Sequence, residues 1–142
     1  MEMKQNAFEL FDAGFNCAES VFAAGLKHLN MDDEGLVPRL ATGFGGGICR
    51  TKSVCGAFTG AVLVLGAKHG RTSIDDDRDV LMGKVQELND WFLKEFNSTN
   101  CYEITGLDFN TSEGMEKYKS GIHKELCTGI VVSTAAKLAE LL

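Results

Sequence analysis

The chain has 142 residues, of which 44% are hydrophobic, and its formal net charge at pH 7 is −6. This length is typical of one domain with a buried core, so we expect a single domain over residues 1–142. The acidic balance argues against nucleic acid as a partner, because binding phosphates requires a basic face. A single proline and the lack of long alternating strand patterns predict an all-α fold, a compact bundle of about five to six helices.

The beginning of the chain lacks a basic region followed by an apolar block, so we do not expect a signal peptide. The longest apolar stretch, residues 54–67, is too short to span a bilayer, and no membrane contact is expected. These features favour a cytoplasmic protein. In that compartment, cysteines more often bind metals, act in catalysis or remain inert than form permanent disulfides.

Three helical segments are predicted before the middle of the chain. Residues 3–13 form an amphipathic helix, and residues 17–29 form a second helix that Asn16 caps at its beginning. Residues 36–42 form a short third helix. A glycine-rich loop follows at residues 43–47, where glycine allows sharp turns and close backbone contacts.

The central helix is predicted over residues 54–68, with Ser53 as its cap. It is apolar all round, which suits a helix in the middle of a bundle. Gly56 and Gly60 are four residues apart and therefore share one face. Because this face carries little side-chain bulk, we expect another helix or a ligand to approach its backbone closely. The same face suggests a homodimer as a candidate assembly.

The second half of the chain is predicted to be helical with one interruption. A fourth helix begins at the three aspartates of residues 75–77 and runs to about residue 96, because acidic residues suit a helix N-terminus. A short turn follows at residues 101–105, and a loop follows at residues 108–114. The last helix is predicted over residues 115–142.

Residues 46–53 read GGICRTKS and come within one residue of a phosphate-binding loop. Thr51 stands where that motif requires its second glycine, and no buried strand precedes the segment. The dinucleotide-binding pattern G-x-G-x-x-G is also incomplete. The glycines therefore predict close backbone approach to a thiol or cofactor rather than nucleotide binding. The candidate residues for this approach are Gly45, Gly46, Gly47 and Gly56.

Four of the five cysteines fall at or near predicted helix starts, where free backbone N–H groups stabilise a thiolate. These candidate catalytic residues are Cys55, Cys17, Cys101 and Cys127. Helix starts in a bundle can meet around one point, so we expect the four thiols to converge. His123 precedes Cys127 by four residues on the same helical face, where it could lower the pKa of that thiol or ligate a metal.

Three functions are compatible with these residues, and the residue types alone do not separate them. In the first, Cys55 and one partner cycle between dithiol and disulfide. In the second, an iron–sulfur cluster or another soft metal ion is held by Cys17, Cys55, Cys101 and Cys127. In the third, the chain is a helical interaction module whose thiols are buried and inert. Whether the chain is an enzyme stays open.

Four sequence blocks carry a resemblance that covers nearly the whole chain. They are FNCAES around Cys17, GFGGG and VCGAFTGAVLVLG around Cys55, CYEITGLDF around Cys101, and HKELCTGIVV around Cys127. In this order they resemble the C_GCAxxG_C_C family, which is named for its cysteine pattern and described as redox-active. The resemblance implies a small, mostly helical, cytoplasmic prokaryotic protein that handles electrons or thiols. A redox partner protein is a candidate partner for such a chain. Cys49 looks like an addition to the family's cysteines.

Overall fold

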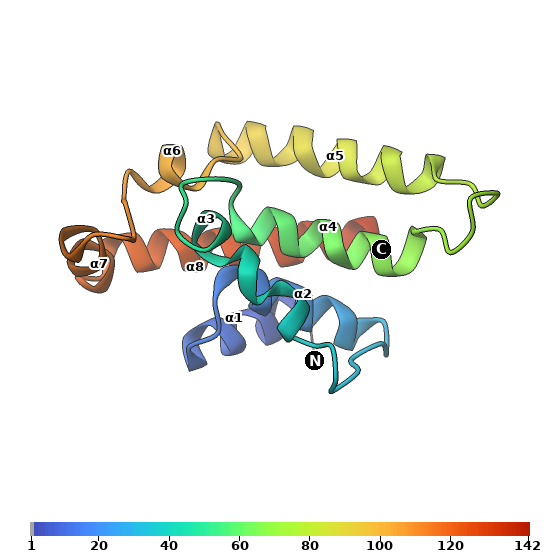
Figure 1. Cartoon of the computed structure of the whole chain (residues 1–142), viewed down its shortest axis with the longest axis horizontal. Coiled ribbons are helices and arrows are strands. Elements are labelled where there is room, and N and C mark those ends of the chain that lie inside the picture. Colours follow the sequence, from blue (N-terminus) through green and yellow to red (C-terminus); the bar gives the residue numbers. More distant parts are fainter. Residues whose placement is uncertain (1) are drawn as a thin grey trace.

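The computed structural model of the chain describes residues 2–142 (Figure 1). These residues form eight α-helices and one 3-10 helix, and none of them belongs to a strand. In chain order the elements are α1 (Met3–Ala13), α2 (Cys17–His28), η1 (Arg39–Phe44), α3 (Gly45–Ile48), α4 (Gly56–His69), α5 (Asp79–Phe96), α6 (Cys101–Thr105), α7 (Ser112–Lys119) and α8 (Ile122–Leu141). The predicted all-α class is confirmed, although the described chain contains more helices than expected.

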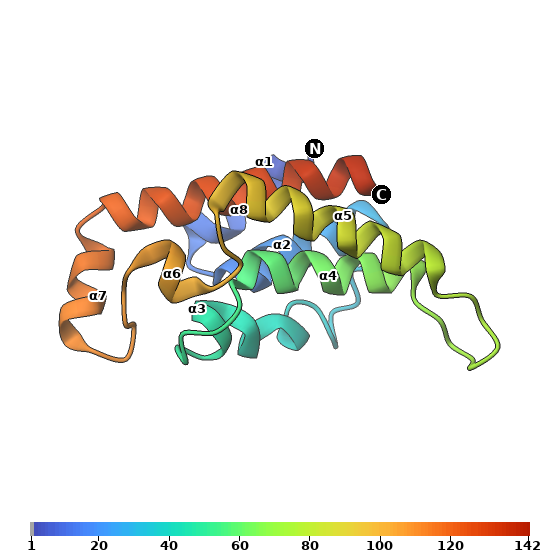
Figure 2. The same ribbon diagram turned by 90° about the horizontal axis from the view of Figure 1, so that it is seen from above.

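The long helices lie side by side (Figure 1, Figure 2). α4, α5 and α8 run lengthwise along the molecule, and α5 is antiparallel to α4. α1 and α2 lie below them in the view of Figure 1, with α2 packed against α4 and α1 packed against α8. The beginnings of α6 and α8 lie in the half of the molecule that ends in α7, and α4 begins near α3, closer to the middle. Several helix starts therefore lie in the same half of the bundle.

α4 lies at the centre of the bundle, as its uniformly apolar sequence predicted. It packs against α2, α5 and α8, and its Val64 and Leu65 side chains have no exposed surface. Ala18 of α2 and Ala57 and Ala61 of α4 are also fully buried. Because alanine adds little bulk, the helix axes can approach one another closely. Within residues 2–142, no helix has both the length and the apolar character needed to cross a bilayer.

The glycines of α4 face α2. A β-carbon added at Gly56 would lie 2.5 Å from Cys17 Sγ, and one added at Gly60 would lie 2.7 Å from the carbonyl oxygen of Ala18. Such distances are too short for a real β-carbon, so glycine is required at both positions. The predicted approach of another helix to this face is confirmed, and that helix is α2.

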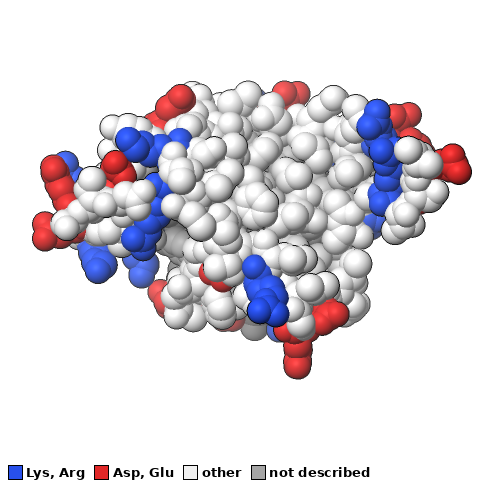
Figure 3. Space-filling model, in the orientation of Figure 1, with Lys and Arg blue, Asp and Glu red and all other residues white. Residues whose placement is uncertain are grey.

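Because α2 covers this face of α4, the face offers no surface to a second copy of the chain. The small-residue face therefore gives no reason to expect a homodimer, and the homodimer itself stays a prediction. The outward side of α4 carries Thr59, Val62, Leu63 and Ala67, which are half-buried and uncharged. Figure 3 shows a broad uncharged area over the middle of the molecule in the same view, with charged side chains around its margins.

Two predicted helices begin later than expected. α5 begins at Asp79 rather than at residue 75. The Asp76 carboxylate accepts hydrogen bonds from the backbone N–H groups of Thr72 at 3.0 Å and Ser73 at 3.2 Å, which holds this segment in a loop. The short helix predicted over residues 36–42 is the 3-10 helix η1, which begins after Pro38.

α7 is a separate helix that the sequence analysis assigned partly to a loop and partly to the last helix. The Thr111 hydroxyl caps α7 by accepting the backbone N–H of Gly114 at 3.0 Å. Gly121 separates α7 from α8, because its φ of 112° lies in the region that favours glycine. This break lets α7 fold back against α8.

Gly60→Ala is expected to lower the free energy of unfolding by about 1–3 kcal/mol, because the added methyl group meets the backbone of α2. The matched control is Gly66→Ala in the same helix, where an added β-carbon meets no atom within 4 Å. That control should be neutral or stabilising by up to about 1 kcal/mol. Urea unfolding followed by circular dichroism measures both changes. Equal stability of the two variants would contradict the close packing of α2 on α4.

Candidate functional site

Cys17 is held at the beginning of α2 by a capping box. The Asn16 Oδ1 accepts the backbone N–H of Glu19 at 2.8 Å, and the Glu19 carboxylate accepts the backbone N–H of Asn16 at 2.9 Å. The predicted Asn16 cap is confirmed. Both side chains also bind Thr42 of η1: Asn16 Nδ2 donates to its carbonyl oxygen at 3.1 Å, and its hydroxyl donates to Glu19 at 2.8 Å. These contacts fasten the first turn of α2 to the chain that leads into the glycine-rich segment.

Cys55 and Cys101 are placed by a short antiparallel pairing of the segments that precede α4 and α6. The N–H of Cys55 donates to the carbonyl oxygen of Thr99 at 2.7 Å, and the N–H of Cys101 donates to that of Ser53 at 2.7 Å. Both cysteines directly follow the bridged pair, so their side chains lie on the same side of the pairing. The prediction that Ser53 caps α4 is wrong, because its backbone is used in this pairing and Cys55 is the N-cap residue.

The glycine-rich segment forms a left-handed turn. The consecutive residues 46–50 all have φ between 49° and 72°. The first two are glycines, which adopt this conformation readily, but Ile48, Cys49 and Arg50 are not. The left-handed conformation costs a residue with a side chain about 1–2 kcal/mol, so surrounding contacts must stabilise the turn.

Hydrogen bonds from two asparagines hold this turn in place. Asn110 Nδ2 donates to the carbonyl oxygen of Arg50 at 2.8 Å, and Asn100 Nδ2 donates to that of Lys52 at 2.8 Å. Within the turn, the Thr51 hydroxyl donates to a backbone carbonyl oxygen at 2.7 Å. The segments that precede α6 and α7 therefore fix the glycine-rich turn, although they are distant from it in the sequence.

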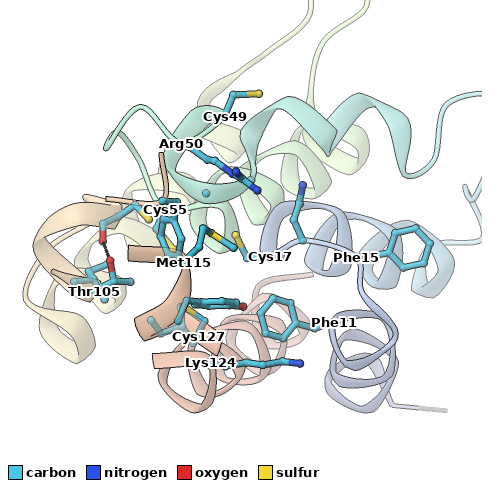
Figure 4. Close-up of a pocket in the computed structure, with 18 of the residues that line it drawn as sticks. Phe11, Phe15, Cys17, Cys49, Arg50, Cys55, Thr105, Met115, Lys124 and Cys127 are labelled. Atoms are coloured by element: carbon cyan, nitrogen blue, oxygen red, sulfur yellow. Dashed lines mark hydrogen bonds between the residues drawn. The ribbon is translucent and has the colours of Figure 1, made fainter. Parts of the chain in front are cut away.

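One cavity of about 570 Å³ has all five cysteines on its wall (Figure 4). The cysteines are Cys17 in α2, Cys49 after α3, Cys55 before α4, Cys101 in α6 and Cys127 in α8. All five thiols are free. The structure therefore brings together the four cysteines that the sequence analysis selected, and each comes from a different helix or helix start.

Cys17 affects the ionisation of the three other selected cysteines. After the larger effect of burial, the charge of Cys17 raises the pKa values of Cys55, Cys101 and Cys127. All four line the same cavity, so a thiolate at Cys17 disfavours a second thiolate at any of the other three. From the sequence, Cys55 was expected to be the central cysteine.

Burial raises the pKa values of all four thiols. It is the largest cause in each case, and with the charge of Cys17 it raises the pKa of Cys101 to about 11 and that of Cys127 to about 12. The pKa of Cys55 is raised well above its usual value, by burial first and by Cys17 second. The expectation that helix starts make these groups thiolates is therefore wrong, because the loss of water around each sulfur outweighs the backbone N–H groups.

Among the four thiols, Cys17 has the most backbone N–H groups that favour its thiolate and so act to lower its pKa. The backbone N–H groups of Gly46, Ala18 and Gly56, together with its own, favour the Cys17 thiolate, although burial still raises its pKa. For Cys55, only two backbone N–H groups in the first turn of α4 act in this way. The left-handed turn and the start of α4 therefore meet at the sulfur of Cys17.

The candidate glycines bring backbone against other parts of the site. Gly45 contacts the Asn16 side chain, and a β-carbon added at Gly47 would lie 2.6 Å from the Cys101 Cβ. Together with the two glycines beside Cys17, all four candidate glycines make close contacts around the thiols. A role of these glycines in holding a cofactor stays a prediction.

Two other residues singled out in the sequence are less closely tied to these four thiols, although Cys49 also lines the cavity. His123 is not among the groups that shift the pKa of Cys127, so the expectation that it lowers this pKa is not met. The His123 Nδ1 is buried and has no hydrogen-bond partner within residues 2–142. Cys49 is exposed, and in Figure 4 its side chain points away from Cys17.

The structure adds three residues that the sequence analysis did not select. Tyr118 of α7 lines the cavity, packs edge-on against Phe109 with 5.4 Å between ring centroids, and has a pKa raised first by burial and then by Cys127. Arg50 and Lys124 also line the cavity. No sequence signal marked these residues, because their positions depend on how the turn and α7 fold back over the thiols.

Among residues 2–142, no group of three or more His, Cys, Asp or Glu side chains is arranged to hold a metal ion. The four thiols share a cavity without forming the compact tetrahedral ligand set of a zinc site or an iron–sulfur cluster. This arrangement does not support the metal or cluster site that the sequence left open.

The protein is expected to lose stability as the pH rises above about 9. In the folded protein, the pKa of Cys101 is about 11 and that of Cys127 is about 12, whereas the unfolded chain releases both protons at a lower pH. The stabilisation is full below the unfolded pKa and is lost as the pH rises through the folded values. Each thiol contributes a slope of about 1.4 kcal/mol per pH unit in this window. Urea unfolding across it measures the slope, which Cys101→Ala should reduce. A slope unchanged by this variant would contradict the raised pKa.

Comparison with curated proteins and with solved structures gave no match. The family described as "Putative redox-active protein (C_GCAxxG_C_C)" matches residues 15–141. The matched range contains all five cysteines and the glycine-rich turn, so it covers the whole thiol cavity except Phe11 and Gly14. The chain therefore belongs to this C_GCAxxG_C_C family.

Proposed function

We propose that the chain is a thiol–disulfide redox protein in which Cys17 is the attacking thiol and Cys55 is its partner. The observation that carries this proposal is the contact of the Cys17 sulfur with the start of α4, on the wall of a cavity that also holds Cys55, Cys101 and Cys127. Thiol–disulfide exchange needs an attacking thiolate and a second thiol nearby that resolves the mixed disulfide.

The surroundings of Cys17 suit an attacking thiol better than those of the other cysteines. The thiolate is the nucleophile, and backbone N–H groups from the glycine-rich turn, α2 and α4 favour it at Cys17. Cys101 and Cys127 have no backbone N–H groups that act in this way. We therefore assign the first step to Cys17.

Cys55 is the best placed partner. It directly precedes Gly56, whose backbone packs against the Cys17 sulfur. Cys17 also affects the pKa of Cys55 more strongly than Cys101 does. A disulfide requires Cα atoms within about 7 Å of each other, and the close packing of the α2 start on the α4 start favours such an approach.

The raised pKa values favour a role as an electron donor. A dithiol becomes a strong oxidant when a low pKa stabilises its reduced form. Burial removes that stabilisation from Cys17 and Cys55, so we expect the pair to give up electrons. A donor of this kind suits the reducing cytoplasm, which is the location expected from the sequence.

In a disulfide redox buffer, the wild-type protein should form one reversible internal disulfide, Cys17–Cys55, which peptide mass mapping identifies. Cys17→Ser and Cys55→Ser should each abolish it, because each removes one of the two sulfurs. Cys49→Ser is the matched control and should leave the disulfide unchanged, because Cys49 is exposed and points away from Cys17.

Cavity thiols that never form a reversible disulfide would contradict the proposal. A disulfide that is lost in Cys49→Ser but kept in Cys55→Ser would show that the partner is assigned wrongly. Stoichiometric iron and sulfide after anaerobic purification, with visible absorbance lost in Cys17→Ser, would show that the cysteines hold a cluster instead.

A further inference from the structure

We infer that the thiol cavity binds a small anionic disulfide with an apolar body, and that Arg50 and Lys124 select this substrate by its charge. The inference rests on the proposed thiol exchange and names the substrate class of the same site. Its grounds are the size of the cavity, the composition of its wall, and the position of its only charged side chains.

The cavity has the size and wall of a small-molecule site. Its volume of about 570 Å³ lies within the roughly 300–1,000 Å³ that proteins use for such ligands. Phe11, Ile104, Phe109 and Met115 contribute apolar or aromatic surface around the thiols. A ligand that fills this space therefore buries an apolar body beside Cys17.

The charge on the wall is entirely positive. Among residues 2–142, Arg50 and Lys124 are the only charged residues that line the cavity, although the chain as a whole has a net charge of −6. Both residues are exposed, and neither forms an ion pair within residues 2–142. Figure 4 shows them on opposite sides of Cys17. Two unpaired cations at the opening attract and orient an anionic group.

The position of the thiols favours a small molecule over a protein disulfide. Cys55 and Cys101 are only 7% and 8% exposed, and the half-buried Cys17 has its sulfur against backbone from α4. A disulfide in a folded protein would have to enter the cavity to meet these sulfurs. A small molecule can enter through the exposed side that carries Arg50 and Lys124.

The exchange is balanced in atoms and electrons. The Cys17 thiolate attacks one sulfur of the substrate disulfide, forms a mixed disulfide and releases the first thiolate of the substrate. Cys55 loses its proton and attacks the Cys17 sulfur, which forms the Cys17–Cys55 bond and releases the second thiolate. The two protein thiols supply two electrons, and their two protons pass to solvent or to the released thiolates.

The test compares two aromatic disulfides of opposite charge character, the dianionic dithiobis(nitrobenzoate) and the neutral dithiodipyridine. All measurements use the Cys49→Ser background, so that the exposed thiol does not react. The ratio of the two rate constants should fall about tenfold in Arg50→Gln/Lys124→Gln, since two attractive charges are lost. The control Arg71→Gln/Arg78→Gln removes two exposed charges away from the cavity and should leave the ratio unchanged.

The same reactions separate failure of this inference from failure of the proposed function. An equal ratio in both double variants would overturn selection by charge, even if the disulfide forms. Faster oxidation by the disulfides of insulin than by dithiobis(nitrobenzoate) would overturn the small substrate. Permanent retention of one probe half on the protein would contradict the Cys17–Cys55 cycle, while the rate ratio would still report on the two cations.

Discussion

The site depends on the packing of the Cys17 sulfur against the backbone at Gly56. Gly56 permits this contact because a β-carbon there would lie 2.5 Å from the sulfur. Gly60 continues the contact one turn later by admitting the backbone of α2. The same packing that places α4 at the centre of the bundle therefore also places the starts of α2 and α4 together. Gly56 and Gly60 are therefore needed both for the stability of the fold and for the position of Cys17.

Two opposing effects then determine the chemistry of Cys17. Backbone N–H groups from three segments favour its thiolate, whereas burial disfavours it and prevails. The resulting site differs from a low-pKa oxidant, whose thiolate is stable at rest. It is better suited to donate electrons when an anionic disulfide enters and the thiolate forms transiently. In this proposal, the positive charges of Arg50 and Lys124 stabilise the developing thiolate and attract the anionic substrate.

Much of this arrangement follows from local sequence signals. The Asn16 cap and the apolar α4 each depend on neighbouring residues, and both predictions are confirmed. The net pKa shift was not predictable, because helix starts reveal nearby N–H groups but not the loss of water that tertiary packing causes. The left-handed turn was missed for a similar reason. Ile48 and Arg50 adopt it against their own preference, with help from Asn110 far along the chain.

The mixed disulfide of the Cys55→Ser variant tests the central role of Cys17 most directly. Without its partner thiol, Cys17 should still attack a small disulfide, but the mixed disulfide should then persist. Brief reaction with dithiobis(nitrobenzoate) in the Cys49→Ser background, followed by peptide mass mapping, locates the retained label. The account predicts the label on Cys17. Label on Cys101 or Cys127 while Cys17 remains a free thiol would contradict it.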